Sequence, residues 1–249
     1  NSKGGDKVAS VRKHYDNFLA EHYSWMFGDF NAKVQENKDF FKLTGIEPRS
    51  GGKALDLGCG SGFQSIALAK LGFRVLAVDI CETLLNELRN RSAGRDINAV
   101  QGDLLDYSIY ADKGPFEVAV CMGDTLTHLQ KTREISALFA NIYSLLEQGG
   151  RFALSFRDLT AELKGIDRII PVRSDDDKIM ATFLEYEATQ VNVHDIVFVK
   201  GDSGWELRKS TYRKLRIGMH QVRDFLQHLG FRVVSSEVQE GFSVIVAQK

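Results

Sequence analysis

The chain has 249 residues, of which 43% are hydrophobic and 26% are charged. This composition is ordinary for a folded globular protein and excludes a disordered or fibrous class. The 32 basic and 33 acidic side chains nearly cancel, so the formal net charge is -1. Nucleic acids and anionic membranes attract strongly basic surfaces, and we therefore expect neither as a partner.

The three cysteines, Cys59, Cys81 and Cys121, are scattered and show no paired spacing. This pattern fits neither a disulfide framework nor a zinc site, so we expect buried thiols and no metal. No apolar run has the length of a membrane span, and residues 1–7 lack the apolar stretch of a secretory signal. We therefore expect a cytoplasmic protein.

Residues 8–43 have a helical pattern and are rich in aromatic side chains, among them Tyr15, Tyr23 and Trp25. Such a segment must cover an apolar surface. We interpret residues 1–45 as an N-terminal helical lid, whose aromatic rings either close over a ligand or pack the helix on the core.

From residue 53 onward, short apolar runs alternate with amphipathic stretches, which is typical of a parallel sheet with helical crossovers. We predict strands at residues 53–57, 74–78, 99–101, 117–122 and 152–156. The predicted helices cover residues 63–71, 84–91 and 133–146. This succession predicts a doubly wound α/β core over residues 46–157.

The alternation ends after the fifth strand. Three strand-like runs, at residues 179–186, 191–199 and 205–215, are separated by polar turns, which predicts an antiparallel β insertion over residues 158–217. A helix at 219–229 and a hairpin of runs 231–238 and 242–248 follow. We expect residues 218–249 to complete a Rossmann-like sheet of seven strands, with the last hairpin antiparallel.

The first strand leads directly into a turn with Gly58, Gly60 and Gly62, and a helix follows. Glycines at such a turn let the backbone approach a ligand closely. Asp79 ends the next strand, where a carboxylate has the reach to accept hydrogen bonds from ribose hydroxyls. The alternatives are a turn without a ligand and, for Asp79, a helix cap.

Nicotinamide enzymes share this layout, but their fingerprint needs a further glycine where this chain has Phe63. Asp56, just before the turn, also favours an ammonium group over a pyrophosphate. A cofactor with an amino-acid tail therefore fits better. An NAD-dependent oxidoreductase is the alternative enzyme class.

The run from Asp56 to Gly62, followed by Asp79, resembles the first motifs of the class I S-adenosylmethionine-dependent methyltransferases. Residues 102–104 are similar to the adenine-binding turn of that family, and residues 121–124 and 145–152 to its fourth-strand end and fifth-strand approach. The resemblance implies S-adenosylmethionine as cofactor. It also implies in-line methyl transfer to a small amine, amino acid or hydroxyl compound. A non-catalytic S-adenosylmethionine-binding protein is the further alternative.

The same resemblance implies which residues bind the cofactor. They are Tyr23, Asp56, Gly58, Cys59, Gly60, Gly62, Asp79, Ile80, Gly102, Asp103, Leu104, Met122 and Gly123. Asp103 alternatively serves only as a turn residue.

A closer resemblance, to glycine and sarcosine N-methyltransferases, rests on residues 121–129 and 155–158 and on the long insertion. It implies that Arg157 holds a substrate carboxylate and that Tyr212 lies near the acceptor. His128, in the loop after the fourth strand, is either a general base or a packing residue. The alternative for Arg157 is an ion pair with an acid such as Asp158 or Glu162.

Two further features bear on the acceptor. Asp124 stands where the glycine enzymes carry Asn, and its added negative charge favours a cationic or neutral acceptor over a small carboxylate. A basic run comprises Arg208, Lys209, Arg213, Lys214 and Arg216. At strand spacing these charges divide between two faces, which predicts a solvated strand instead of a phosphate-binding patch.

Overall fold

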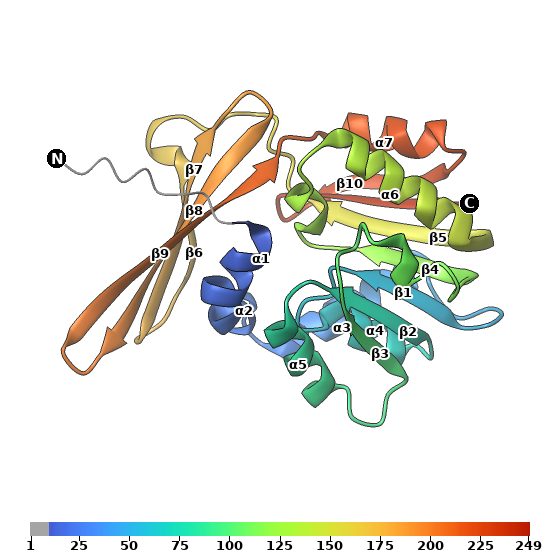
Figure 1. Cartoon of the computed structure of the whole chain (residues 1–249), viewed down its shortest axis with the longest axis horizontal. Coiled ribbons are helices and arrows are strands. Elements are labelled where there is room, and N and C mark those ends of the chain that lie inside the picture. Colours follow the sequence, from blue (N-terminus) through green and yellow to red (C-terminus); the bar gives the residue numbers. More distant parts are fainter. Residues whose placement is uncertain (1–9) are drawn as a thin grey trace.

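The structure is a computed structural model that describes residues 10–249. Two β-sheets lie on either side of the N-terminal helices α1 and α2 (Figure 1). The larger sheet has seven strands and the smaller one has four, in the order β6-β7-β8-β9. The helices between them therefore contact both sheets, which decides where a ligand site forms.

The seven-stranded sheet has the order β10-β11-β5-β4-β1-β2-β3. Its strands are β1 (Lys53–Leu57), β2 (Arg74–Asp79), β3 (Ile97–Gln101), β4 (Phe116–Cys121), β5 (Leu146–Phe156), β10 (Arg232–Gln239) and β11 (Phe242–Gln248). Neighbours from β3 to β5 pair in parallel, whereas β11 is antiparallel to both β5 and β10. The predicted seven-stranded Rossmann-like sheet with an antiparallel hairpin is confirmed.

Helices cover both faces of this sheet, so its central strands are buried on both sides and apolar at nearly every position. On one face lie α3 (Phe30–Leu43), α4 (Phe63–Lys70) and α5 (Glu82–Arg91). On the other lie α6 (Thr132–Leu145) and α7 (Met219–His228). Successive residues of β1 alternate between the two cores, because strand side chains point to opposite faces.

The N-terminal segment is helical but interrupted. It comprises α1 (Val11–His14), a π-helical turn η1 (Tyr15–Leu19) and α2 (Ala20–Phe27). Gly28, with a φ of 82°, breaks the helix, and the Asp29 side chain then caps α3 by accepting the Ala32 N–H at 2.7 Å. The expected single pattern over residues 8–43 is thus two helical segments. Residues 8 and 9 lie outside the described part.

The smaller sheet contains β6 (Ile169–Ser174), β7 (Lys178–Tyr186), β8 (Gln190–Gly201) and β9 (Gly204–Leu215), all antiparallel. The sequence predicted three of these strands and missed β6. Pro171 lies inside β6, and proline is tolerated there because β6 is an edge strand. Single 3-10 turns complete the chain: η2 (Tyr107–Ile109), η3 (Thr125–His128) and η4 (Gly165–Arg168).

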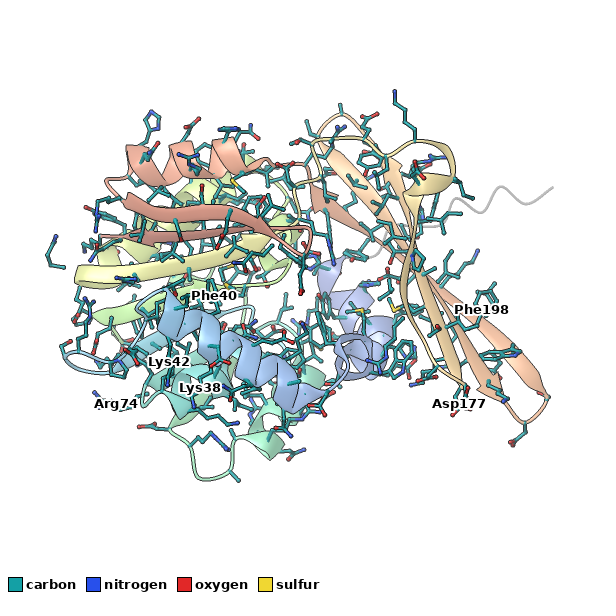
Figure 2. The ribbon with its side chains drawn as sticks, turned by 180° about the vertical axis from the view of Figure 1, so that it is seen from behind. Lys38, Phe40, Lys42, Arg74, Asp177 and Phe198 are labelled. Carbon is teal, nitrogen blue, oxygen red and sulfur yellow. The ribbon has the colours of Figure 1, made fainter. Side chains whose placement is uncertain are left out.

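One face of the smaller sheet packs on the N-terminal helices through Met180 and Val197, which contact Phe18 and Leu19. Figure 2 shows this sheet from behind, with its far end, near Asp177 and Phe198, projecting away from the core. Within residues 10–249, no helix combines the length and apolarity needed to cross a membrane. The three cysteines are free and buried, as predicted.

Glu117 on β4 ties the loop before β1 to the sheet. Its carboxylate accepts the backbone N–H groups of Arg49 at 2.6 Å, Ser50 at 3.0 Å and Gly52. Burial opposes ionisation, but these donors prevail and lower the pKa of Glu117 below its usual value. The charged carboxylate is therefore the form that the fold stabilises.

We predict that Glu117→Gln lowers the free energy of unfolding by about 1–3 kcal/mol, because the amide cannot satisfy three buried donors. Urea denaturation at pH 7 measures this loss. Since the folded pKa is depressed, the contribution exists above the unfolded pKa and fades as the pH falls through the folded pKa. Glu147→Gln is the matched control, because Glu147 accepts only the Ser50 hydroxyl. Equal stability of the two variants contradicts the assigned role.

Candidate functional site

A cavity of about 660 Å³ opens at the carboxyl ends of the parallel strands. Gly58 follows β1, Asp79 ends β2, Gly102 follows β3 and Thr125 follows β4, and all four line it. In the sheet β1 lies between β2 and β4, and the chain runs outward from β1 to β2 and β3 before it crosses back to β4. The strand order therefore reverses beside β1, which makes this the topological switch point of the sheet. Ligands of open α/β sheets bind at such a point.

The glycine turn forms one wall of the cavity. Gly58 and Gly60 have φ values of 75° and 51°, a region that L side chains rarely adopt. A Cβ on Gly60 would lie 3.1 Å from the Tyr23 hydroxyl, and one on Gly58 would overlap the Thr125 side chain. Any larger residue at either position would therefore enter the space that Tyr23 and Thr125 occupy.

Asp79 fixes the turn and faces the cavity. Its carboxylate accepts the Gly60 N–H and the Cys81 N–H, each at 2.8 Å. Burial raises the pKa of Asp79, while these two donors oppose the rise. Each oxygen accepts one backbone N–H and keeps capacity for another donor, which suits the hydroxyl groups of a ribose.

The third strand end supplies the next stretch of wall, where Gly102, Asp103 and Leu104 line the cavity. Asp103 also accepts the Leu105 N–H at 2.9 Å, so it is a turn residue and a cavity residue at once. The Gly102 N–H donates to the Asp79 carbonyl at 2.9 Å. These bonds align the second and third strand ends beside each other.

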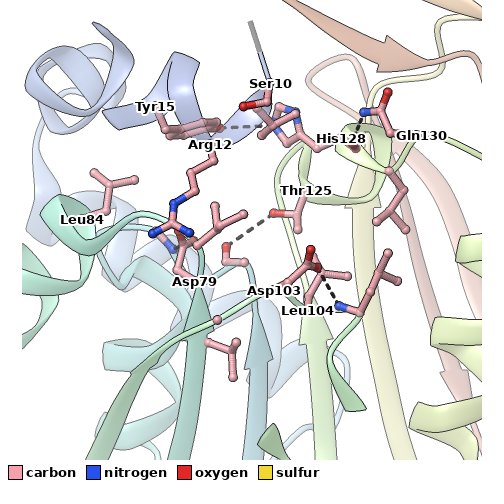
Figure 3. Close-up of a pocket in the computed structure, with 18 of the residues that line it drawn as sticks. Ser10, Arg12, Tyr15, Asp79, Leu84, Asp103, Leu104, Thr125, His128 and Gln130 are labelled. Carbon is pink, nitrogen blue, oxygen red and sulfur yellow. Dashed lines mark hydrogen bonds between the residues drawn. The ribbon is translucent and has the colours of Figure 1, made fainter. Parts of the chain in front are cut away.

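The N-terminal helices close the cavity from above. Figure 3 shows Arg12 and Tyr15 entering from α1 and η1, across from Asp103 and Thr125. The Tyr15 hydroxyl lies 3.2 Å from His128 Nε2. Burial raises the pKa of both Tyr15 and Tyr23, so both phenols stay neutral. The aromatic residues predicted to form a lid therefore separate: Tyr15 and Tyr23 line the cavity, and Trp25 packs on the smaller sheet.

His128 lies at the end of η3 and lines the cavity beside Tyr15. Its Nδ1 is buried without a hydrogen-bond partner among residues 10–249. Burial, followed by the positive charge of Lys214, lowers the pKa of His128 to about 3. The imidazole is therefore neutral at physiological pH, and one of its ring nitrogens is a hydrogen-bond acceptor.

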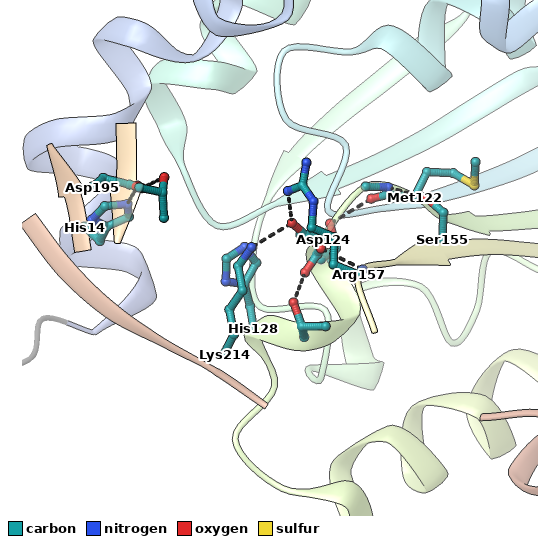
Figure 4. Close-up of polar contacts among 12 residues, drawn as sticks. His14, Met122, Asp124, His128, Ser155, Arg157, Asp195 and Lys214 are labelled. Atoms are coloured by element: carbon teal, nitrogen blue, oxygen red, sulfur yellow. Dashed lines mark hydrogen bonds and ion pairs between the residues drawn. The ribbon is translucent and has the colours of Figure 1, made fainter. Parts of the chain in front are cut away.

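A buried ion cluster adjoins His128 (Figure 4). Asp124 Oδ2 lies 2.6 Å from Lys214 Nζ and 2.8 Å from Arg157 Nη1, and Asp124 Oδ1 accepts the Arg157 N–H at 3.0 Å. Burial would raise the pKa of Asp124, but Lys214 and Arg157 hold it well below its usual range. Two cations, Lys214 and Arg157, thus compensate the negative charge that Asp124 adds to this site.

The prediction of a solvated strand is wrong at Lys214, because the side chain of Lys214 is only 8% exposed. The other members of the basic run for which contacts are described also have partners in the chain. Arg208 pairs with Glu21, Arg213 with Glu187 and Arg216 with Glu162.

Five predicted cofactor residues are not among the residues that line the cavity. Asp56 is buried and accepts the Ser65 hydroxyl at 2.6 Å, and burial raises the pKa of Asp56 to about 7. Cys59 is buried, and a Cβ on Gly62 would overlap Leu88. Met122 packs against the core. The Gly123 N–H donates to Ser155 Oγ at 2.7 Å.

Two predicted acceptor residues also lie outside the lining. Arg157 is half exposed, pairs with Asp124 and lies 4.3 Å from the centroid of the Phe242 ring. Its partner is thus neither of the acids suggested by the sequence. Tyr212 is buried, stacks on His14 with ring centroids 4.0 Å apart, and lies 5.5 Å from the His128 ring. The other predicted site residues line the cavity together, and they are Tyr23, Gly58, Gly60, Asp79, Ile80, His128 and residues 102–104.

The cavity lining also includes polar residues for which the sequence indicated no role in the site, among them Ser10, Arg12, Gln130, Glu134 and Arg213. They come from three parts of the chain that are far apart in sequence, which are the start of α1, the start of α6 and β9. Capping patterns around Ser10 and Glu134 mark helix starts. They do not indicate which cavity those helices border.

Metal ligation does not account for this arrangement. Within the part of the chain that the structure describes, no group of three or more His, Cys, Asp or Glu side chains is placed to hold a metal ion.

Comparison with known proteins adds family information. Residues 54–150 match a methyltransferase domain. Glycine/sarcosine N-methyltransferase of Parasynechococcus marenigrum (strain WH8102) is 29% identical over 170 residues, which are 65% of this chain and 59% of that protein. The chain thus matches less than two thirds of that relative.

Two solved structures share the fold. The CcbJ methyltransferase of Streptomyces caelestis superposes with a TM-score of 0.77 at 19% identity, over 95% of this chain and 98% of that one. CalS10 of Micromonospora echinaspora, an amino pentose methyltransferase solved with S-adenosylmethionine bound, has a TM-score of 0.71 at 16% identity, over 92% and 96%.

The glycine turn, the acid at the end of β2 and the size of the cavity fit an adenosyl cofactor. The methyltransferase domain at residues 54–150 and the relatives that share it support a class I S-adenosylmethionine-dependent methyltransferase with S-adenosylmethionine as its cofactor.

Proposed function

We propose that this protein transfers a methyl group from S-adenosylmethionine to a nitrogen atom of a small-molecule amine. The observation that carries the proposal is that one cavity joins the glycine turn and Asp79 to the neutral pair Tyr15 and His128. The N-methyltransferase among the relatives and the amino pentose enzyme among the structural neighbours support an amine as acceptor.

In this proposal the wall residues hold the cofactor. The Asp79 carboxylate accepts the ribose hydroxyls, and the turn at residues 102–104 borders the adenine. Gly58 and Gly60 border the methionine part, with Tyr23 above them. The predicted cofactor residues outside the cavity lining would support the turns at the strand ends: Asp56, Cys59, Gly62, Met122 and Gly123. Residues 1–45 and 158–217 would shape the acceptor side.

S-adenosylmethionine supplies an activated methyl group on a sulfonium, so positioning and exclusion of water are the main tasks of the protein. When the acceptor binds, its amine N–H takes the place of the Tyr15 hydroxyl at His128 Nε2. By donating to that nitrogen, the amine points its lone pair at the methyl carbon. The new N–C bond forms as the C–S bond breaks, and its electron pair goes to sulfur. The methylated amine is then cationic and releases its proton to solvent.

The compensated charge of Asp124 bears on the choice of acceptor. Because two cations share this carboxylate, it does not present a free negative charge that would hold an ammonium group near the methyl. An acceptor that enters as a neutral amine therefore fits this corner. Arg157, engaged with Asp124 and Phe242, borders the acceptor region instead of clamping a carboxylate.

We predict that Asp79→Asn weakens S-adenosylmethionine binding about 10-fold or more, because a charged acceptor of two hydroxyl groups is lost. Isothermal titration calorimetry measures the affinity, with NADH as the comparison ligand. Asp96→Asn is the control, since Asp96 is exposed and lies just before β3, at the opposite edge of the sheet. Unchanged affinity in Asp79→Asn, or tighter binding of NADH, contradicts the assignment.

We predict that His128→Ala lowers kcat about 100-fold with little change in cofactor affinity, because a misplaced acceptor loses the alignment that transfer needs. S-adenosylhomocysteine formation is followed with a panel of primary and secondary amines and the corresponding alcohols. His220→Ala, an exposed histidine on α7, is the control. Cofactor binding without turnover on any amine would refute the proposed reaction.

A further inference from the structure

Lys214 is a buried cation that the smaller sheet inserts beside the cavity. It lies near the end of β9, and its side chain is 8% exposed. Burying an ammonium group is costly unless a partner compensates it. Asp124 is that partner, at 2.6 Å, and it belongs to the seven-stranded domain, so the ion pair joins the two sheets.

The pair lies next to the histidine that faces the acceptor. Asp124 caps η3, the 3-10 turn that carries His128 at its other end. The Tyr212 ring is near both His128 and Lys214: its centroid is 5.5 Å from that of the His128 ring and 5.7 Å from Lys214 Nζ. Figure 4 shows the contact between Lys214 and Asp124.

Four charged or titratable groups face the imidazole besides Lys214. They are Asp124 before η3, Tyr15 on η1, His14 on α1 and Tyr212 on β9. Burial is the largest influence on the pKa of His128, and next comes Lys214, which lowers it. Asp124 acts in the opposite direction, because a carboxylate favours a protonated imidazole. Lys214 therefore acts twice: it repels a proton from His128 and cancels the carboxylate that would attract one.

The protonation state matters for the proposed reaction, on which this inference rests. A neutral imidazole accepts a hydrogen bond from an amine N–H and leaves the nitrogen lone pair free. An imidazolium has donors at both ring nitrogens. It would donate to the lone pair that must attack the methyl carbon.

We propose that Lys214 is a positioning residue for methyl transfer: paired with Asp124 next to the turn that carries His128, it keeps His128 an uncharged hydrogen-bond acceptor. The residue comes from the inserted sheet. Docking of that sheet on the core therefore completes the electrostatics of the site as well as its shape.

The test is an NMR titration of protein labelled with ¹³C at histidine Cε1, with His128→Gln used to assign the signal. In Lys214→Gln the amide keeps a hydrogen bond to Asp124 but removes the charge. We expect the wild-type His128 signal to stay in the neutral form down to the acid limit of the folded state. In Lys214→Gln its midpoint should move up towards the ordinary value of about 6.5.

Two further variants separate charge from packing. Lys214→Arg keeps the cation and should leave His128 neutral. The double variant Lys214→Gln with Asp124→Asn removes both charges and should return the midpoint to the acid side. In methyl-transfer assays, kcat of Lys214→Gln should gain an acidic limb at the NMR midpoint. The double variant should lose that limb.

A His128 midpoint that does not move in Lys214→Gln, with kcat reduced equally at every pH, would overturn the proposal and leave Lys214 a structural residue. Should Lys214→Gln fail to fold, as judged by circular dichroism, Asp124→Asn and the double variant are compared instead. A higher midpoint in the double variant supports the proposal, and equal midpoints oppose it. The titration needs no turnover, so absence of methyl transfer in the wild type would refute the proposed function separately.

Discussion

The site depends on one constraint: parallel strands joined by helical crossovers all end at the same edge of the sheet. Four loops therefore meet where β1, β2, β3 and β4 end, although along the chain these loops are spread from residue 58 to residue 125. The hydrogen bond from the Gly60 N–H to Asp79 then locks two of these loops together. The wall proposed to hold the cofactor follows from this edge and this bond.

The N-terminal helices and the smaller sheet use the remaining space above that edge. Gly28 breaks the helical segment, so that α1 and α2 lie over the cavity while α3 packs on the core. Tyr23 takes the space that the missing Cβ of Gly60 leaves. Phe63 packs against Phe30 in a tilted arrangement and edge-on against Phe27, at centroid distances of 4.7 and 5.3 Å. Where a nicotinamide enzyme carries the third glycine of its fingerprint, this chain thus has Phe63, which contacts the N-terminal helices.

The corner around Asp124 shows how charge is managed in a buried site. A carboxylate and an ammonium group are buried together beside a half-exposed guanidinium, and neither of the two buried charges would be stable there alone. Their arrangement keeps Asp124 ionised and His128 neutral, because the cation of Lys214 lowers the pKa of the carboxyl group and of the imidazole alike. Such a corner forms only when β9 is docked beside η3, since Lys214 lies on β9 and Asp124 directly precedes η3.

The sequence by itself determined the core. Its alternation of apolar runs and amphipathic stretches gave the order of strands and helices, because strand and helix periods differ. The glycines and Asp79 indicated the cofactor, because a tight turn and an acid one strand later are local features of the chain. Only the tertiary structure decided which residues line the cavity and what state they are in. Lys214 had the spacing of an exposed strand residue, and Asp56 and Gly62 had the spacing of ligand contacts. Their burial depends on contacts between elements that are far apart in the sequence, such as β9 with η3 and α5 with the glycine turn. Local periodicity therefore cannot predict it.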